Sequence, residues 1–308
     1  SLGAITLYKM GSEALKAELL RELLIGPICC LLYSEPGAGS DLAGIRTRAV
    51  KDGDEFIING QKVWTSNAQE AEYGMLLTRT DFDVPKHQGI TFFIFPMKQE
   101  GVEVRPINQI TRESEFNEVF ISNARVSERY IIGDYNKGWK SFQAAIASER
   151  LIMGMGVTAR SGMSSHSKAP ALLRLAHKYD RLKEPALRQE IAQALAYRQL
   201  NSLTMQRAVE EIKTNGISSL MSLGKLSMSR IQHGEARLSG TILGPRVLVN
   251  DTEDARHANF DAAKAYMNSI GGGTDQIQRN IIAERILGLP RSNDVDREIP
   301  FKEIKTGG

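Results

Sequence analysis

The chain has 308 residues, of which 42% are hydrophobic, and this is enough for two domains with a real core. Its net charge of +3 comes from 39 basic and 36 acidic side chains with no basic cluster, which argues against a nucleic-acid partner. The longest apolar run, residues 23–33, is broken by Gly26 and Pro27 and is too short for a membrane span. The two cysteines, Cys29 and Cys30, are adjacent in this run, a pattern typical of buried thiols in a reducing, cytoplasmic protein.

Residues 1–28 are predicted to be the tail of a helical domain. Ser12 is a candidate N-cap for a helix whose Leu15, Leu19 and Leu23 fall on one stripe. The glycine–proline pair that follows this stripe is a helix stop signal.

Residues 29–134 are predicted to form an antiparallel, barrel-like β domain. Apolar side chains recur there with a period near two, and turn pairs interrupt them. Asp52–Gly53 and Asn59–Gly60 are the hairpin signals between the first strands. The strand candidates are residues 45–50, 55–58, 61–65, 74–80, 91–95, 102–106 and 118–121.

Residues 135–308 are predicted to form a helical domain, most simply a four-helix bundle with extra helices. The fold class is therefore α+β. Glycine and proline punctuate the helices at positions such as Gly240 and Pro290. The helix candidates are residues 139–156, 170–182, 185–214, 217–238, 254–270 and 275–287.

Two neighbouring stretches suggest a ligand site in the β domain. In C-L-L-Y-S-E-P-G-A-G-S-D, residues 30–41, an apolar run ends in a glycine-rich loop with the hydroxyls of Ser34 and Ser40. Gly37 and Gly39 permit positive φ and close backbone approach. A plain turn explains the loop about as well on the pattern alone. Its companion is K-V-W-T-S-N, residues 62–67.

A third stretch, I-G-G-G-T-D-Q-I-Q-R-N-I-I-A-E-R-I-L-G-L-P-R, covers residues 270–291. Three glycines precede Thr274, a candidate N-cap, and a helix start of this kind suits an anion. A glycine C-cap followed by a capped helix is an equally good interpretation.

Glu149, followed by Arg150, is a carboxylate on an otherwise apolar helix stripe. Most such residues lie at an edge or in a salt bridge, so position alone makes a functional role the minority interpretation. The five histidines lack metal-ligand spacing, and we expect no metal site.

The three motifs Y-S-E-P-G-A-G-S-D, N-G-x-K-x-W-T-S-N and G-G-T-x-x-I-Q-R-N-I-I-A-E-R-x-L-G-L-P-R resemble the signature of the acyl-CoA dehydrogenase family. The resemblance implies a flavoprotein that binds FAD, with a larger N-terminal helical domain that is mostly absent from this chain. It also implies site residues: Ser34 and Ser66 on the edge of the flavin, Trp64 against its ring, Thr274 and Gln276 on the FAD, and Ser40 on the CoA arm.

The chain departs from the commonest family pattern at the catalytic carboxylate. Most members carry a Glu immediately before the G-T of the last motif, where this chain has Gly272. A minority place it on a bundle helix before an Arg, and Glu149 with Arg150 matches that arrangement. Residues 159–170 lack the family's R-x-x-F-G segment, and residues 241–248 are also altered. These changes resemble a bacterial branch with steroid-degrading members, some built from unlike subunits.

The resemblance implies α,β-dehydrogenation of an acyl-CoA thioester to the trans-2-enoyl-CoA. Glu149 would remove the α-proton, the flavin would take the β-hydride, and an electron-transfer flavoprotein would reoxidise the FAD. We also expect a homo- or hetero-oligomer. Two alternatives stay open: a non-catalytic partner subunit of a hetero-oligomeric dehydrogenase, and an oxidase or monooxygenase on the same fold.

Overall fold

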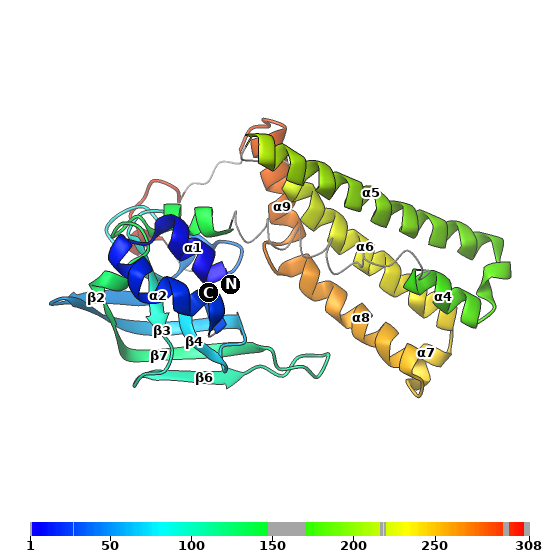
Figure 1. Ribbon diagram of the computed structural model, residues 1–308, viewed down its shortest axis with the longest axis horizontal. Coiled ribbons are helices and arrows are strands. Elements are labelled where there is room, and N and C mark those ends of the chain that lie inside the picture. Colours follow the sequence, from blue (N-terminus) through cyan, green and yellow to red (C-terminus); the bar gives the residue numbers. More distant parts are fainter. Residues whose placement is uncertain are drawn as a thin grey trace. The chain divides into compact units, whose positions relative to one another are not determined.

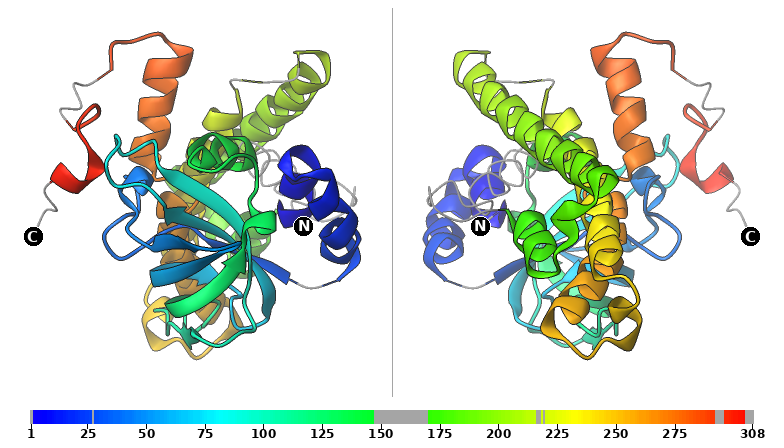
Figure 2. Two further views of the ribbon diagram at one scale, coloured as in Figure 1. Left: turned by 90° about the vertical axis from the view of Figure 1, so that its left-hand side faces the viewer. Right: turned by 90° about the vertical axis from the view of Figure 1, so that its right-hand side faces the viewer.

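The computed structural model describes residues 2–26, 28–146, 170–215, 218, 220–291 and 296–304. The chain forms two compact units, one from residues 1–149 and 292–308 and the other from residues 150–291. The first combines a sheet with helices, and the described part of the second is helical (Figures 1 and 2). The predicted α+β fold is confirmed, whereas the predicted boundaries at residues 28 and 134 stay a prediction.

Two helices, α1 (Leu2–Met10) and α2 (Glu13–Ile25), lie against one face of the sheet (Figure 1). The hydroxyl of Ser12 accepts a hydrogen bond from the Leu15 amide at 3.2 Å and so caps α2. The predicted stripe of α2 leucines is buried against the sheet, which confirms this helix.

The sheet has seven strands in the order β1-β4-β2-β3-β7-β6, with β5 also paired to β4. Most pairings are antiparallel, but β4 pairs in parallel with both β1 and β2, which the sequence did not indicate. The strands are β1 (Ile28–Leu32), β2 (Arg48–Asp52), β3 (Glu55–Ser66), β4 (Ala71–Arg79), β5 (Ile90–Pro96), β6 (Val102–Pro106) and β7 (Phe116–Ser127).

Strand β5 explains how this domain is held together, because both of its faces are buried. Phe92 and Ile94 pack into the core beneath α1 and α2. Phe93 and Phe95 point the other way into a second core that the curved sheet encloses. The barrel-like character predicted for the domain follows from this enclosed second core.

Only one of the two predicted hairpin turns is present. Asp52–Gly53 turns β2 into β3, and Gly53 takes φ +62° as such a turn requires. Asn59–Gly60 lies inside the continuous strand β3, so the hairpin predicted there is wrong. The glycine serves packing instead, because a Cβ at Gly60 would lie 2.7 Å from the Cα of Thr47.

The second unit contains long helices that lie side by side (Figures 1 and 2). Its described helices are α4 (Ala171–Lys178), α5 (Pro185–Asn215), α6 (Leu220–Leu243), α7 (Arg246–Val249), α8 (Glu253–Ile270) and α9 (Asp275–Ile281). Helix α6 packs against both α5 and α8. It continues through Gly240, where the sequence suggested a stop, to Leu243.

The helix predicted over residues 139–156 is described only as far as residue 146. Among the described helices, none is long and apolar enough to cross a membrane. After α9 the chain returns to the first unit, where residues 296–304 include a 3₁₀ turn at Phe301–Glu303.

Two glycine substitutions test this packing in opposite directions. Gly60→Ala forces a methyl group into the backbone of Thr47 and should destabilise the protein by about 1–3 kcal/mol. Gly234→Ala, inside α6, meets no atom within 4 Å. It should stabilise the helix by about 0.5–1 kcal/mol. Urea unfolding of both variants checks this, and equal stabilities would contradict the packing described for Gly60.

Candidate functional site

The loop of residues 34–47 leaves β1 and is fastened to β3. The Val63 amide donates to the carbonyl of Ser34 at 2.9 Å. A tight turn follows, in which Glu35 and Ala38 exchange two backbone hydrogen bonds of 3.0 Å. Gly37 and Gly39 do not use positive φ, but a Cβ at either would meet no atom within 4 Å. The two glycines therefore leave this side of the loop open.

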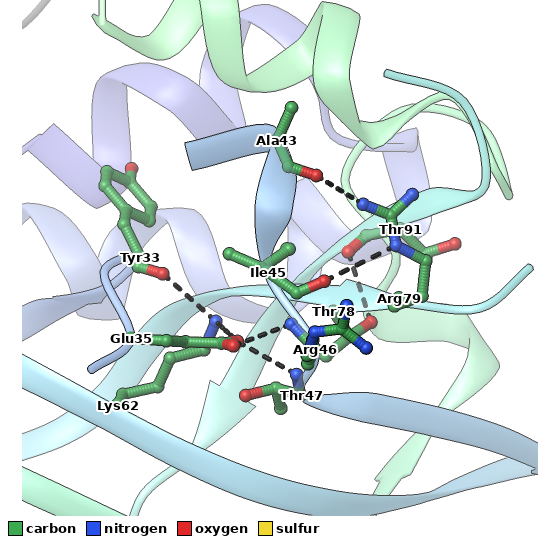
Figure 3. A network of polar contacts seen from close by, with 10 residues as sticks. All are labelled: Tyr33, Glu35, Ala43, Ile45, Arg46, Thr47, Lys62, Thr78, Arg79 and Thr91. Atoms are coloured by element: carbon green, nitrogen blue, oxygen red, sulfur yellow. Dashed lines mark hydrogen bonds and ion pairs between the residues drawn. The ribbon is translucent and has the colours of Figure 1, made fainter. Parts of the chain in front are cut away.

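A buried ion pair holds the loop from beneath (Figure 3). The Lys62 ammonium donates to Glu35 Oε1 at 2.8 Å and to the Tyr33 carbonyl at 3.1 Å. The same carboxylate accepts the amides of Arg46 at 2.6 Å and Thr47 at 2.9 Å. The side chains of Glu35 and Lys62 are 8% and 0% exposed. One carboxylate thus connects both ends of the 34–47 loop to β3.

The surroundings of Glu35 keep it ionised. Burial by itself would raise its pKa, but the Lys62 ammonium and the hydrogen bonds from Lys62, Thr47 and Arg46 outweigh burial. The net pKa lies below its ordinary value of 4.5. The stability that this carboxylate adds is therefore present above pH 4.5 and is lost as the pH falls through its lower folded-state pKa.

A bulge in β3 aims Trp64 outward. Lys62 pairs with Val119 and Thr65 with Asn117, so two residues of β3 stand opposite one of β7. Trp64 takes φ +60°, which costs a bulky residue about 1–2 kcal/mol, and its ring is 59% exposed. Strain of this kind is concentrated at functional sites.

Three serine hydroxyls lie on β3 or on the 34–47 loop that is fastened to this strand. Ser66 is also exposed two residues after Trp64, and Ser34 lies beside Val63 through the backbone bond described above. Within the described part of the chain, the hydroxyls of Ser34, Ser40 and Ser66 make no hydrogen bond. The first unit therefore offers an exposed tryptophan, together with unengaged hydroxyl groups on the same strand and on the loop fastened to it.

The residues that follow Ser66 are fixed from inside the barrel. The buried amide of Asn117 donates to the carbonyl of Thr65 at 2.9 Å and to Gln69 Oε1 at 2.6 Å. The Asn67 amide donates to the Glu115 carbonyl at 2.8 Å. These bonds hold the end of β3, and with it Ser66, in one position.

In the second unit, Thr274 caps α9 as predicted. Its hydroxyl accepts from the Ile277 amide at 3.2 Å, and Gln276 is exposed. Gly272 and Gly273 take φ +65° and +88°, so this approach to the helix uses the left-handed region that glycine tolerates best.

The start of α9 is anchored to α6 and α8 by a polar network. Asp275 accepts from Lys225 at 3.1 Å and from the Ser229 hydroxyl at 2.7 Å. Ser269 joins the hydroxyl of Ser229 to the His233 ring through contacts of 2.8 and 2.7 Å. A cavity of about 460 Å³ adjoins the network, lined by Leu226, Ser227, Ser229, Arg230, His233, Asp275 and Arg279.

Glu149, the predicted base, lies outside the described residues. The alternative family position, Gly272, carries no carboxylate. In the described ranges, no group of three or more His, Cys, Asp or Glu side chains is arranged to hold a metal ion.

Comparison with known proteins identifies the family. Residues 30–124 match the acyl-CoA dehydrogenase middle domain, and residues 136–287 match the acyl-CoA dehydrogenase C-terminal domain. Acyl-CoA dehydrogenase IpdE1 of Mycobacterium tuberculosis is 37% identical over 277 residues, which cover 85% of this chain and 67% of that protein. The chain belongs to the acyl-CoA dehydrogenase family.

Other relatives are similar over most of this chain but differ in length. Acyl-CoA dehydrogenase FadE34 of M. tuberculosis is 36% identical over 85% of this chain, which spans only 35% of that protein. Among solved structures, the Tcur3481-Tcur3483 steroid ACAD has a TM-score of 0.80 at 29% identity, over 94% of this chain and 76% of that chain. The ChsE4-ChsE5 complex from M. tuberculosis has a TM-score of 0.74 at 26% identity, over 94% of this chain and 76% of that chain.

Membership of the predicted family is thereby confirmed, and FAD is the cofactor of that family. The described residues fit this cofactor. An exposed aromatic residue held in a strained conformation, with unengaged hydroxyls on the same strand and its adjoining loop, suits the flat, polar-edged ring system of a flavin.

The sequence carries no signal for the roles of Glu35, Lys62 and Asn117. A lysine inside a strand candidate suggests a solvent-facing position, and its burial depends on an ion pair with Glu35, which is 27 residues away. Glu35 stands where the apolar run ends at Pro36, and nothing in that pattern indicates a buried partner. The polar network around Asp275 was likewise missed, because its members come from three separate helices.

Removing only one partner of the Glu35–Lys62 ion pair should destabilise the protein strongly. Lys62→Met leaves the Glu35 carboxylate buried without its cation and should cost about 3–5 kcal/mol in urea unfolding. The double variant Glu35→Gln/Lys62→Met should cost less than the sum of the single variants.

Lys51→Met is the matched control, because Lys51 pairs with Glu128 on the surface and both side chains are about half exposed. It should leave stability nearly unchanged. If the loss of unfolding free energy in the double variant equals the sum of the losses in the two single variants, Glu35 and Lys62 do not act as a pair.

Proposed function

We propose that the complete protein is an FAD-dependent dehydrogenase that converts an acyl-CoA thioester to the trans-2-enoyl-CoA. The observation that carries this proposal is the exposed, strained Trp64 on a strand and adjoining loop whose serine hydroxyls lack internal partners among the described residues. The chain itself supplies the positions of these groups, and bound FAD supplies the acceptor for the hydride that leaves the β-carbon.

In the first unit, Ser34 and Ser66 would hydrogen-bond the edge of the flavin while Trp64 covers its ring. Ser40, exposed at the far end of the glycine turn, would contact the CoA arm. In the second unit, Thr274 and Gln276 would contact the FAD. These roles are supported by family membership and by the exposure of Trp64, Ser66, Ser40 and Gln276.

Glu149 is the proposed base for the α-proton. A thioester α-proton is only weakly acidic, so the reaction needs a positioned base. With Gly272 at the other family position, the chain has no carboxylate there to compensate. The proton therefore passes from the substrate α-carbon to the Glu149 carboxylate in this proposal.

The proposed substrate class is a bulky acyl-CoA, such as a steroid side-chain thioester. The Tcur3481-Tcur3483 protein, a steroid ACAD, is 29% identical to this chain, and this likeness supports a bulky acyl group over a short linear chain. Electron transfer to an electron-transfer flavoprotein and a cytoplasmic location belong to the same proposal.

We also propose that the protein is an oligomer. Leu200 and Leu203 on α5 are 58% and 50% exposed, and Leu223 on α6 is 36% exposed. Apolar side chains on long helices favour burial against another chain. ChsE4-ChsE5 is a complex of two differently named proteins, and Tcur3481-Tcur3483 likewise pairs two names. An unlike partner subunit is therefore the main alternative to a homo-oligomer.

The test is the variant Glu149→Gln in the complete protein. It should keep its flavin and still bind acyl-CoA, but anaerobic flavin reduction should slow by about two to four orders of magnitude because the positioned base is lost. Stopped-flow absorbance of the flavin measures the rate. Glu210→Gln, which changes an exposed carboxylate on α5, is the control and should reduce flavin at the wild-type rate.

Three results would redirect the proposal. Unchanged flavin reduction in Glu149→Gln would mean that another group is the base. Wild-type protein that binds FAD but is never reduced by any acyl-CoA would favour a non-catalytic partner subunit. Reduction followed by rapid oxygen consumption would favour an oxidase.

A further inference from the structure

A short C-terminal segment pairs with the loop that follows β4. Residues 300–303, called here the C-terminal strap, pair with residues 82–85 of the first unit. The Phe301 amide donates to the Val84 carbonyl at 2.9 Å, and the Lys302 amide donates to the Phe82 carbonyl at 3.0 Å. Phe301 is 1% exposed, so the strap buries one aromatic side chain completely.

The ring of Phe301 covers a buried arginine. The Cζ atom of Arg79 lies 3.9 Å from the ring centroid, and Arg79 is fully buried. Within the described residues, no carboxylate lies at ion-pair distance from this guanidinium. Burial lowers its pKa to about 10, so Arg79 stays charged at neutral pH. A buried cation needs compensation, and an aromatic face provides part of it.

Further compensation comes from the nearby carboxylates of Glu35, Asp81 and Asp41 and from backbone carbonyls of the 34–47 loop and of Gln88. Arg79 donates to the carbonyl oxygens of Ala43 at 2.6 Å and Ile45 at 3.5 Å (Figure 3). It also donates to the carbonyl of Gln88 at 2.6 Å. Its backbone amide also donates to the Thr47 carbonyl at 2.7 Å. Arg79 therefore fixes the second half of the loop whose first half is held by Glu35.

The strap also contacts Arg46, a loop residue that is hydrogen-bonded to Glu35. The guanidinium of Arg46 lies 4.9 Å from the Phe301 ring centroid, while its backbone amide donates to Glu35 Oε2. The Phe301 ring thus contacts Arg46 within the loop and Arg79, which binds the carbonyls of the loop. Neither the family motifs nor the proposed reaction gives Phe301 a role.

We propose that the C-terminal strap positions the 34–47 loop, with Phe301 holding the Arg79 guanidinium against the carbonyls of residues 43 and 45. This inference rests on the proposed function in so far as the 34–47 loop binds FAD. Loss of the ring admits water to Arg79, frees the guanidinium to leave the loop carbonyls, and loosens the segment between Ser34 and Thr47. Phe301 is a positioning residue, since it acts on the site through Arg79.

The test compares Phe301→Ala with Phe301→Leu, which keeps apolar cover but lacks an aromatic face. Hydrogen exchange of peptides covering residues 41–47 should accelerate at least about tenfold in Phe301→Ala and less in Phe301→Leu. Exchange in β5 should stay slow. The dissociation constant for FAD, measured by flavin fluorescence, should rise about tenfold in Phe301→Ala.

Lys302→Ala is the control, because it removes only the exposed pair between Lys302 and Asp83. It should change neither measurement. Unchanged exchange at residues 41–47, or equal acceleration in β5, would overturn the proposal, and Phe301→Leu decides it if the alanine variant does not fold. Wild-type protein that binds no FAD would refute the proposed function, whereas the exchange measurement would still decide the role of the strap.

Discussion

The buried pair of Glu35 and Lys62 is the interaction on which the site-bearing part of the fold depends. Its carboxylate joins β3 to the two amides at the end of the 34–47 loop, and its ammonium reaches back to the carbonyl at the loop's start. Both side chains are buried, so separating them would leave an uncompensated buried charge at a large cost in free energy. The loop therefore has one strongly preferred position relative to Trp64.

This constraint explains how a sheet of ordinary apolar strands presents polar groups at one place. Lys62 shares the inward face of β3 with Phe56 and Ile58, and the bulge that follows it leaves Trp64 exposed. Ser34 is fixed beside the bulge by a backbone bond, and Ser66 is fixed by Asn117 on the neighbouring strand. The exposed ring and hydroxyls are thus held from beneath by buried polar contacts, which is the preorganisation that a cofactor site requires.

Much of the local structure could be predicted because its signals are short-range. Ser12 and Thr274 cap helices as their positions indicated, since an N-cap needs only its own next turn. The hairpin at Asn59–Gly60 was wrong because the contact with Thr47, distant in sequence, decides what the glycine does. Burial of Lys62 was missed for the same reason: its partner is 27 residues away.

The most direct measurement of the central claim uses the protein's two tryptophans. Trp139 packs against His87 and Phe142, so Trp139→Phe should fold and leaves Trp64 as the single tryptophan. Stoichiometric FAD added to the flavin-free form of this variant should quench nearly all Trp64 fluorescence, because a flavin in contact with an indole ring quenches its fluorescence efficiently. Stoichiometric FAD binding with unchanged Trp64 emission would contradict the account, since the flavin would then lie away from the surface that Glu35 and Lys62 hold in place.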